Sequence, residues 1–499
     1  MKKYGFLFGA GAELAYNMPS GGQFALDIFR QDPASPKQHF REMRDNVDPT
    51  TSYANDWLPE KYRDKNISAF GKSVFENLIS STVEYNRTRV IEKVNSFDET
   101  ALKVINQMEG SVDIDGAIFA LLGREVSNIK LSQNIAYNDN FKRGNLLFES
   151  NYFSALLLVY KSMQDDSTKS VLRRILVSIM QLQLGALSED LTKSINDNLF
   201  AKKDDGIDLF DDFGELIQIN YNAAGVSGLE FLLEKREPDL LTPTGVVLYF
   251  AQKLIEDIYA SVLDYKTLID SNWHNLYCPK ADWAKFCKIT IFLLTVREYI
   301  SKLGADAKKD NPDGYYNMLK DAIDHRFFEV TAIATTNYNS LIEEILDKDI
   351  TYLNGSTSVW YDPYLNKIGT EDELTDEERH IIVPLIFTQS GTKPMTAISM
   401  SVRYVDLYRK WKESDAIVVV GFGFGSDDEH INGILRTLVN DDGKELIIVT
   451  KGKNAGAIGR QKAKALKIRD ASKIKVIAVD DKGRSGDKRW VDLLGETHD

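Results

Sequence analysis

The chain has 499 residues and a formal net charge of −13, and its two cysteines, Cys278 and Cys287, do not form a C-x-x-C pair. The length predicts two domains, or one domain that carries a large insertion. The charge disfavours a general nucleic-acid-binding surface, and the cysteines exclude a disulfide framework or a four-cysteine zinc site, so we expect small molecules or proteins as partners and no metal.

We expect neither a signal peptide nor a membrane span in this chain. An apolar run follows Lys2 and Lys3, but it ends at two glycines, which is too soon for a signal peptide. No uninterrupted apolar span reaches the length of a membrane helix. With so few cysteines, we expect a cytoplasmic protein that has no membrane partner.

The N-terminal stretch from Tyr4 to Glu13 reads Tyr-Gly-Phe-Leu-Phe-Gly-Ala-Gly-Ala-Glu. Gly5 to Phe8 is too short and too uniformly apolar for a helix, which indicates a buried strand. Gly9 and Gly11 would let the backbone pass close to a ligand, and residues 12–16 would open a helix toward a phosphate. The third glycine of G-x-G-x-x-G is missing, and glycines that only relieve crowding are the alternative reading.

The middle of the chain has a different character. From Ser68 to about Lys320, apolar residues recur at helical spacing, which predicts a long block of helices. No fixed period indicates a solenoid. Because the N-terminal strand needs neighbours, we expect this block to be an insertion within, or beside, one α/β domain.

Strands return after the helical block. Residues 328–335 read FEVTAIAT, which is typical of a central parallel strand covered on both faces. Further strands are expected at 350–353, 381–387, 415–420, 445–450 and 474–479. Helices are expected between them at 341–346, 398–411, 429–439 and 455–466. This alternation predicts an α/β fold with a Rossmann-like, doubly wound, mostly parallel sheet and a large all-helical insertion.

Three segments describe the expected domain organisation. Residues 1–31 would form the first strand and cofactor loop, 32–325 the helical insertion or regulatory domain, and 326–499 the remainder of the Rossmann-like domain. Ligands of such sheets bind at the carboxyl ends of the strands. Four polar or glycine-rich segments follow predicted strands and would make one site: Gly9 to Glu13, Thr336 to Asn339, Asn354 to Ser356, and Gly421 to Asp428.

These segments resemble the sirtuin superfamily, and specifically the bacterial sirtuin-like NAD hydrolases of phage defence. The resemblance covers residues 1 to about 30 and about 327 to 450. Gly9-Ala-Gly11 looks like the family's G-A-G, Thr335 to Asn339 is similar to its T-T-N-Y-D signature, and Gly421 to Ile431 resembles its late glycine segment. The resemblance implies contacts with NAD for Gly9, Ala10, Gly11, Glu13, Pro19, Ser20, Thr336, Asn339, Gly421, Gly423, Ser426 and Asp427.

The resemblance also implies two residues at the reacting ribose. Asn337 would lie nearest the nicotinamide ribose, and Asn354 stands where the family carries its general-base histidine. A neutral amide cannot accept a proton at useful pH, so a deacetylation route would lose its base. Hydrolysis needs a base less, because nicotinamide leaves as a neutral molecule from a cationic glycoside.

The expected function is therefore a sirtuin-like NAD⁺ glycohydrolase that cleaves NAD⁺ to nicotinamide and ADP-ribose. The family implies a regulated anti-phage effector that acts by abortive infection, forms a homo-oligomer, and responds to an activating protein or a phage-derived trigger. The alternative is a catalytically impaired sensor or scaffold that binds NAD or ADP-ribose. His325, His380 and His430 are each interpreted as structural residues rather than as a replacement base.

Overall fold

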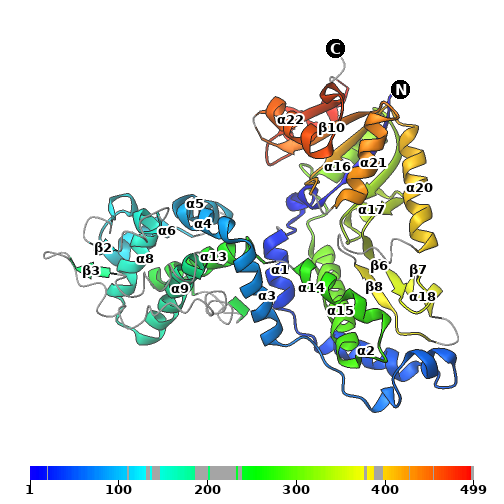
Figure 1. Cartoon of the computed structure of the whole chain (residues 1–499). Helices are drawn as coiled ribbons and strands as arrows, with labels where there is room; N and C mark the ends of the chain where they lie inside the picture. The colour runs from blue at the N-terminus through cyan, green and yellow to red at the C-terminus, as the bar shows by residue number, and fades with distance from the viewer. Residues whose placement is uncertain are drawn as a thin grey trace. The chain divides into compact units, whose positions relative to one another are not determined.

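The computed structural model describes most of the chain (Figure 1). The described residues are 1–499 except 20, 109–111, 131–134, 138–145, 186–199, 203–231, 234–238, 264, 376–378, 387–396, 426–427, 453 and 496–499.

The chain divides into two compact units, each built from separate segments. The sheet unit consists of residues 1–20, 31–70 and 266–499, and the helical unit of residues 21–30 and 71–265. The sheet unit therefore takes in 31–70 and 266–325. The sequence-based division, which stays a prediction, groups both of these segments with the helical insertion.

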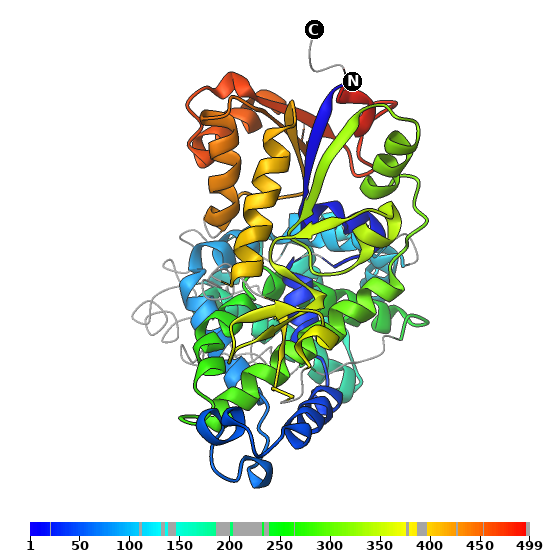
Figure 2. The ribbon, with the colours of Figure 1, turned by 90° about the vertical axis from the view of Figure 1, so that its right-hand side faces the viewer.

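A six-stranded, entirely parallel sheet forms the centre of the sheet unit, with the order β11-β10-β9-β1-β4-β5. Its strands are β1 (Lys3–Phe8), β4 (Glu329–Thr335), β5 (Ile350–Tyr352), β9 (Ala416–Val420), β10 (Glu445–Lys451) and β11 (Ile474–Val479). In chain order the strands are arranged 3-2-1-4-5-6, which is the Rossmann order. Figure 2 shows the N-terminal strand β1, in blue, beside β4, in green. The parallel α/β sheet expected from the sequence is confirmed.

Helices cover both faces of this sheet. The helices of the sheet unit are α2 (Ala34–Asn46), α14 (Tyr265–Asn272), α15 (Trp283–Asp306), α16 (Tyr315–Asp324), α17 (Leu341–Leu346), α18 (Glu371–Leu374), α20 (Ile398–Lys412), α21 (Glu429–Asn440), α22 (Ala455–Leu466) and α23 (Trp490–Leu493). One hydrophobic core joins the sheet to α16, α17 and α23, and a second joins it to α20, α21 and α22. The arrangement is a three-layer, doubly wound fold.

Alternating side chains of β1 supply both cores. Tyr4, Phe6 and Phe8 point into the core with α16, whereas Leu7 points into the core with α20, as the two-residue period of a strand requires. Gly5 makes room for Trp411 of α20, because a Cβ at Gly5 would lie 2.3 Å from its Cδ1 atom.

A second, antiparallel sheet lies in the same unit and corrects one expectation. It has the order β7-β6-β8, with β6 (Gly355–Asp362), β7 (Lys367–Gly369) and β8 (Val383–Ile386). The segment expected at 381–387 as a strand of the parallel sheet is therefore paired with β6 instead. The turn expected at 354–357 is also wrong from Gly355 onward, because β6 begins there. The backbone of Gly355 has φ +82°, and a Cβ on this residue would lie 1.8 Å from Leu385 O. The tight pairing of β6 with β8 therefore requires glycine at this position.

The helical unit contains α1 (Gly21–Phe29), α3 (Lys72–Tyr85), α4 (Arg87–Asn95), α5 (Phe97–Gln107), α6 (Ile114–Leu122), α8 (Asn151–Ser162), α9 (Asp166–Gly185) and α13 (Pro243–Ala260). An antiparallel pair, β2 (Ile135–Tyr137) and β3 (Phe200–Lys202), also belongs to it, so the unit is not purely helical. The start of the long helix α13 is capped, because the Thr242 hydroxyl accepts the Gly245 N–H at 3.1 Å and Pro243 stands at the first position.

Candidate functional site

The direction of the strand order reverses between β1 and β9. From β1 the chain moves outward through β4 and β5, and from β9 it moves outward in the other direction through β10 and β11. Ligands of open α/β sheets bind outside the carboxyl ends of the strands at such a reversal. The turns that follow β1 and β9 contain the predicted glycines of the cofactor site.

Close backbone packing joins these two turns. The Gly9 N–H donates to Val420 O at 2.9 Å, and the Gly11 N–H donates to Gly421 O at 3.0 Å. A Cβ at Gly9 would lie 2.7 Å from Gly421 O, and a Cβ at Gly421 would lie 2.2 Å from the Ala12 nitrogen. The glycines thus relieve crowding between neighbouring turns, which is the alternative reading of the sequence, and their contact with a cofactor stays a prediction.

The helix expected at residues 12–16 is wrong. The segment forms two 3₁₀ turns, η1 (Ala10–Ala12) and η2 (Leu14–Tyr16), and the left-handed Asn17, at φ 66°, ends the second. The N–H groups of Ala12 and Glu13 bond to carbonyls three residues earlier at 3.0 and 3.1 Å. These donors are therefore used inside the turns.

A buried polar cluster surrounds Glu13, which is only 4% exposed. Its Oε1 accepts the Tyr316 hydroxyl at 2.9 Å, and its Oε2 accepts the Asn339 amide at 2.7 Å. The Asn337 amide donates to the Tyr316 hydroxyl at 3.3 Å. Burial raises the pKa of Glu13, while the hydrogen bonds from Asn339, Tyr316 and Asn337 oppose that shift. Three predicted site residues from β1 and β4 thus meet in one network.

Local hydrogen bonds explain how the Thr-Thr-Asn-Tyr-Asn segment holds its shape. The Thr335 hydroxyl accepts the Asn337 N–H at 3.0 Å, and the Asn339 Oδ1 accepts the Leu341 N–H at 3.0 Å. Such side-chain-to-backbone bonds stabilise turns after strands. The Asn339 side chain therefore starts α17 with its oxygen and binds Glu13 with its nitrogen.

Tyr316 was not identified from the sequence. Its ring stacks on Tyr16 with centroids 5.2 Å apart at 16°, and the Tyr16 hydroxyl accepts the Tyr316 N–H at 2.8 Å. Burial and the adjacent Glu13 raise the pKa of Tyr316 well above its usual value. A usable signal exists: a helix that leads into a parallel strand starts at the carboxyl edge of the sheet, so the first residues of α16 belong beside the ends of β1 and β4.

Asn354 follows β5 and is 8% exposed. Its Oδ1 lies 3.4 Å from Nε2 of His430, which is the second residue of α21. The backbone beside it is tied to the β4 end, because the Leu353 N–H donates to Thr335 O at 2.9 Å. Asn354 therefore lies next to the segment that contains Asn337, and His430 lies next to Asn354.

The remaining predicted residues occupy different surroundings. Ala10 is exposed, and Pro19 is half-buried between η2 and α1. The Thr336 N–H donates to Phe8 O at 3.0 Å, and the exposed Gly423 accepts the Lys462 ammonium at 2.9 Å through its carbonyl. Ser20, Ser426 and Asp427 lie outside the described residues.

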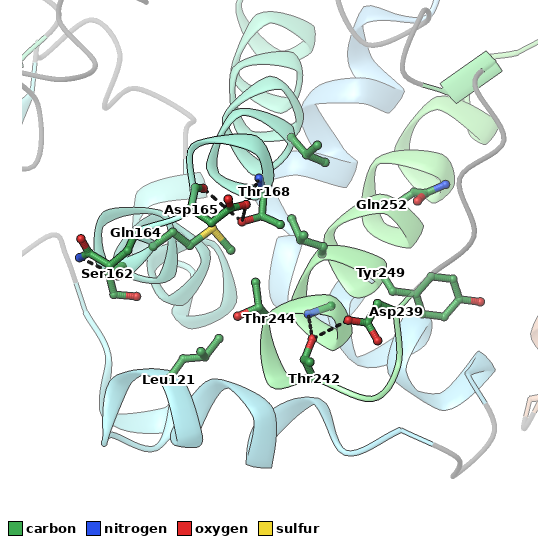
Figure 3. Close-up of a pocket in the computed structure, with 14 residues that line it drawn as sticks. Leu121, Ser162, Gln164, Asp165, Thr168, Asp239, Thr242, Thr244, Tyr249 and Gln252 are labelled. Atoms are coloured by element: carbon green, nitrogen blue, oxygen red, sulfur yellow. Dashed lines mark hydrogen bonds between the residues drawn. The ribbon is translucent and has the colours of Figure 1, made fainter.

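A separate cavity of about 570 Å³ lies within the helical unit (Figure 3). Part of its polar lining is engaged in helix caps: Asp165 accepts the Thr168 N–H at 2.9 Å before α9, and Thr242 donates to Asp239 at 3.0 Å before α13. The hydrogen bonds from Thr168 and Ser167 lower the pKa of Asp165 to about 2. These groups serve the helix ends, and the cavity contains none of the predicted site residues.

Within the described part of the chain, no cluster of three or more His, Cys, Asp or Glu side chains is arranged to hold a metal ion. Among the same residues, no helix is both long and apolar enough to cross a membrane. No protein-family model and no curated protein matches this chain.

Proposed function

We propose that the sheet unit binds NAD⁺ at the carboxyl ends of β1, β4 and β9 and hydrolyses it to nicotinamide and ADP-ribose. The observation that carries this proposal is the meeting of Glu13, Asn337 and Asn339 at the carboxyl ends of β1 and β4, next to the point where the Rossmann strand order reverses. These residues come from segments more than 300 positions apart. The sirtuin resemblance assigns Asn337 to the nicotinamide ribose, and Glu13 and Asn339 to contacts with NAD.

The buried network suits a positioning role for Asn337. Its amide nitrogen is held by the Tyr316 hydroxyl, which in turn is held by Glu13. This leaves the Asn337 Oδ1 to accept a hydrogen bond from a ribose hydroxyl or from the attacking water. Asn337 is 7% exposed, so a small part of it is accessible at the strand ends. Fixing the reactants in this way supplies much of the rate of a displacement that needs no general acid.

The helical unit and the biological role belong to the same proposal. A hydrolase that consumes NAD⁺ has to be restrained in an unstimulated cell, which gives a large helical insertion a regulatory purpose. We therefore propose an anti-phage effector of the cytoplasm that acts by abortive infection as a homo-oligomer. An activating protein or a phage-derived molecule would release it.

A second function is favoured by one observation, which is the amide at position 354. A sensor or scaffold would keep the nucleotide site without the family's histidine after β5. It would bind NAD or ADP-ribose and release the ligand intact, so the recovered ligand distinguishes the two functions.

The test is the release of nicotinamide from NAD⁺ by the purified full-length chain. We expect Asn337→Ala to lower kcat about a hundredfold or more, because the ribose and water lose their alignment. Calorimetry with NAD⁺ should show that binding persists. Free nicotinamide, separated by chromatography, is the quantity to follow.

The matched control is Asn46→Ala, which removes an exposed asparagine of the same unit at the end of α2. This variant should retain full activity. Wild-type protein that binds NAD⁺ and returns it uncleaved would instead establish the sensor. Equal nicotinamide release by the wild type and Asn337→Ala would remove Asn337 from the mechanism.

A further inference from the structure

The pair formed by Asn354 and His430 is not explained by the network around Glu13. Asn354 follows β5, whereas His430 comes from the first turn of α21, 76 positions further along the chain. Their side chains lie 3.4 Å apart, from Asn354 Oδ1 to His430 Nε2. Helix α21 therefore places an imidazole at the carboxyl end of β5.

Helix α20 holds this strand end in place. The Tyr404 hydroxyl donates to Leu353 O at 2.6 Å, and the Arg403 guanidinium donates to Tyr352 O at 3.1 Å. The Tyr404 ring also meets the His430 ring edge to face, with centroids 6.2 Å apart at 71°. Backbone and imidazole thus share one rigid support.

Two backbone hydrogen bonds place Asn354 beside the reacting segment. The Leu353 N–H donates to Thr335 O at 2.9 Å, and the Thr357 N–H donates to Tyr338 O at 2.8 Å. In one segment the two bonds lie before and after Asn354, and in the other segment they lie before and after Asn337. The His430 imidazole is consequently one side chain away from the segment that carries Asn337.

We propose that His430 is the general base of NAD⁺ hydrolysis and that Asn354 is the residue that positions its ring. This inference rests on the proposed NAD⁺ hydrolase function. In this proposal the His430 Nε2–H donates to the Asn354 Oδ1 across the 3.4 Å contact, so the Nδ1 carries the lone pair. A histidine from α21 thereby takes the role that the resemblance expects of position 354.

The charges around His430 are consistent with a base. Burial lowers the pKa of His430, and Asp428 opposes that shift. The Tyr404 ring packs against the His430 ring, and Arg403 is the charged group that acts on Tyr404. Burial also raises the pKa of Tyr404, so its hydroxyl stays neutral. The imidazole is therefore uncharged near neutral pH, as a proton acceptor must be.

The proposed step balances in atoms and charge. The water oxygen forms a bond to C1′ of the nicotinamide ribose, and the bond from C1′ to the nicotinamide nitrogen breaks. That nitrogen keeps the electron pair and leaves as neutral nicotinamide. One water proton passes to His430 and then to solvent, which leaves ADP-ribose.

The first measurement compares the wild type with His430→Gln in nicotinamide release across pH. We expect kcat to fall about 100- to 10,000-fold, as for loss of a general base, while the NAD⁺ affinity measured by calorimetry is retained. The acid limb of the wild-type profile should disappear. His430→Ala provides a second substitution, and His325→Gln is the control, since that exposed histidine lies at the far end of β4.

The second measurement tests the positioning role. In Asn354→Asp a carboxylate would face the imidazole and raise its pKa, so the acid limb should move to higher pH. A purely structural role for position 354 would leave the limb where it is.

The outcomes separate the two proposals. If His430→Gln and His430→Ala keep the wild-type kcat while Asn337→Ala loses it, His430 is not the base and the hydrolase stands. If the wild type releases no nicotinamide, both proposals fall together. Loss of activity in the His430 variants with NAD⁺ binding intact, together with the shifted limb of Asn354→Asp, supports the inference.

Discussion

Glu13 is almost fully buried, yet its hydrogen bonds fix the side chains of the candidate site. Its carboxylate accepts hydrogen bonds from Tyr316 and Asn339, and through Tyr316 it also fixes Asn337. The sirtuin resemblance implies a contact with NAD for Glu13. A buried carboxylate is costly unless donors surround it, so the donors and Glu13 must be regarded as a unit.

The raised pKa of Glu13 predicts a pH dependence of folding stability. The group binds its proton more tightly in the folded chain than at its ordinary value of 4.5. Its contribution to stability is therefore largest at low pH and is lost as pH rises from 4.5 through the folded pKa. Glu13→Gln cannot ionise, so the free energy of unfolding of the wild type minus that of the variant should decrease across this window.

Urea unfolding at a series of pH values measures this difference. Exposed Glu413 gives the control, because Glu413→Gln removes a carboxylate from the surface of the same unit. Parallel stability curves for the wild type and Glu13→Gln would show that Glu13 titrates alike in both states.

At the scale of elements, the packing of the turns after β1 and β9 makes different demands on neighbouring glycines. Gly421 has φ +67°, and its Cβ would meet backbone atoms of Ala12 and Gly11 at 2.2 and 2.6 Å. Gly423, two residues later, is exposed, and a Cβ there would meet nothing within 4 Å. The same residue type is thus sterically required at one position and not at the other.

We expect Gly421→Ala to lower the free energy of unfolding by about 2 to 4 kcal/mol, from left-handed strain and overpacking. Gly423→Ala should change it by less than about 0.5 kcal/mol. All six tryptophans lie in the sheet unit, so tryptophan fluorescence during urea unfolding reports this unit selectively. Equal midpoints for the two variants would contradict the close packing of the turns.

Strand prediction succeeded where a strand is apolar on both faces. The expected strands near β1, β4, β9, β10 and β11 are found within a few residues, because covered parallel strands need continuous apolar runs. The segment that forms β8 is just as apolar, yet it pairs with β6. Apolar patterning reports burial, whereas the choice of partner strand depends on the path of the chain through residues 354–382.

On the scale of the whole molecule, the N-terminal segment contributes to both units. Its strand β1 lies in the sheet unit, and α1 lies in the helical unit. There Arg30 bonds Glu256 at 2.7 Å, with side-chain exposures of 9% and 3%. Burial alone would raise the pKa of Glu256, but Arg30 and Lys253 bring it below its ordinary value. The ion pair ties α1 to α13 within the helical unit.

Arg30→Ala should destabilise the helical unit by about 3 kcal/mol, because the buried Glu256 would lose its buried partner and keep only the partly exposed Lys253. Circular dichroism follows helices of both units, while tryptophan fluorescence follows only the sheet unit. We expect the dichroism transition to move to lower urea and the fluorescence transition to stay. Arg124→Ala, at an exposed position of the helical unit, should move neither.

The candidate site was readable from the sequence only in part. Glu13, Asn337, Asn339 and Asn354 could be chosen because polar residues after buried strands gather at one edge of a parallel sheet. Tyr316 could not be chosen from local pattern, since an aromatic residue at a helix start has the signature of an ordinary core residue.

The sequence by itself therefore determined the parallel α/β framework, because short apolar runs indicate buried strands. It also determined the edge at which polar residues gather, because these residues follow the predicted strands. Packing between distant segments decided the rest. Through this packing, the glycines allow two turns to approach closely, Tyr316 covers Glu13, and His430 lies beside Asn354. Those contacts join positions up to about 400 residues apart, so they exist only when the layers have assembled.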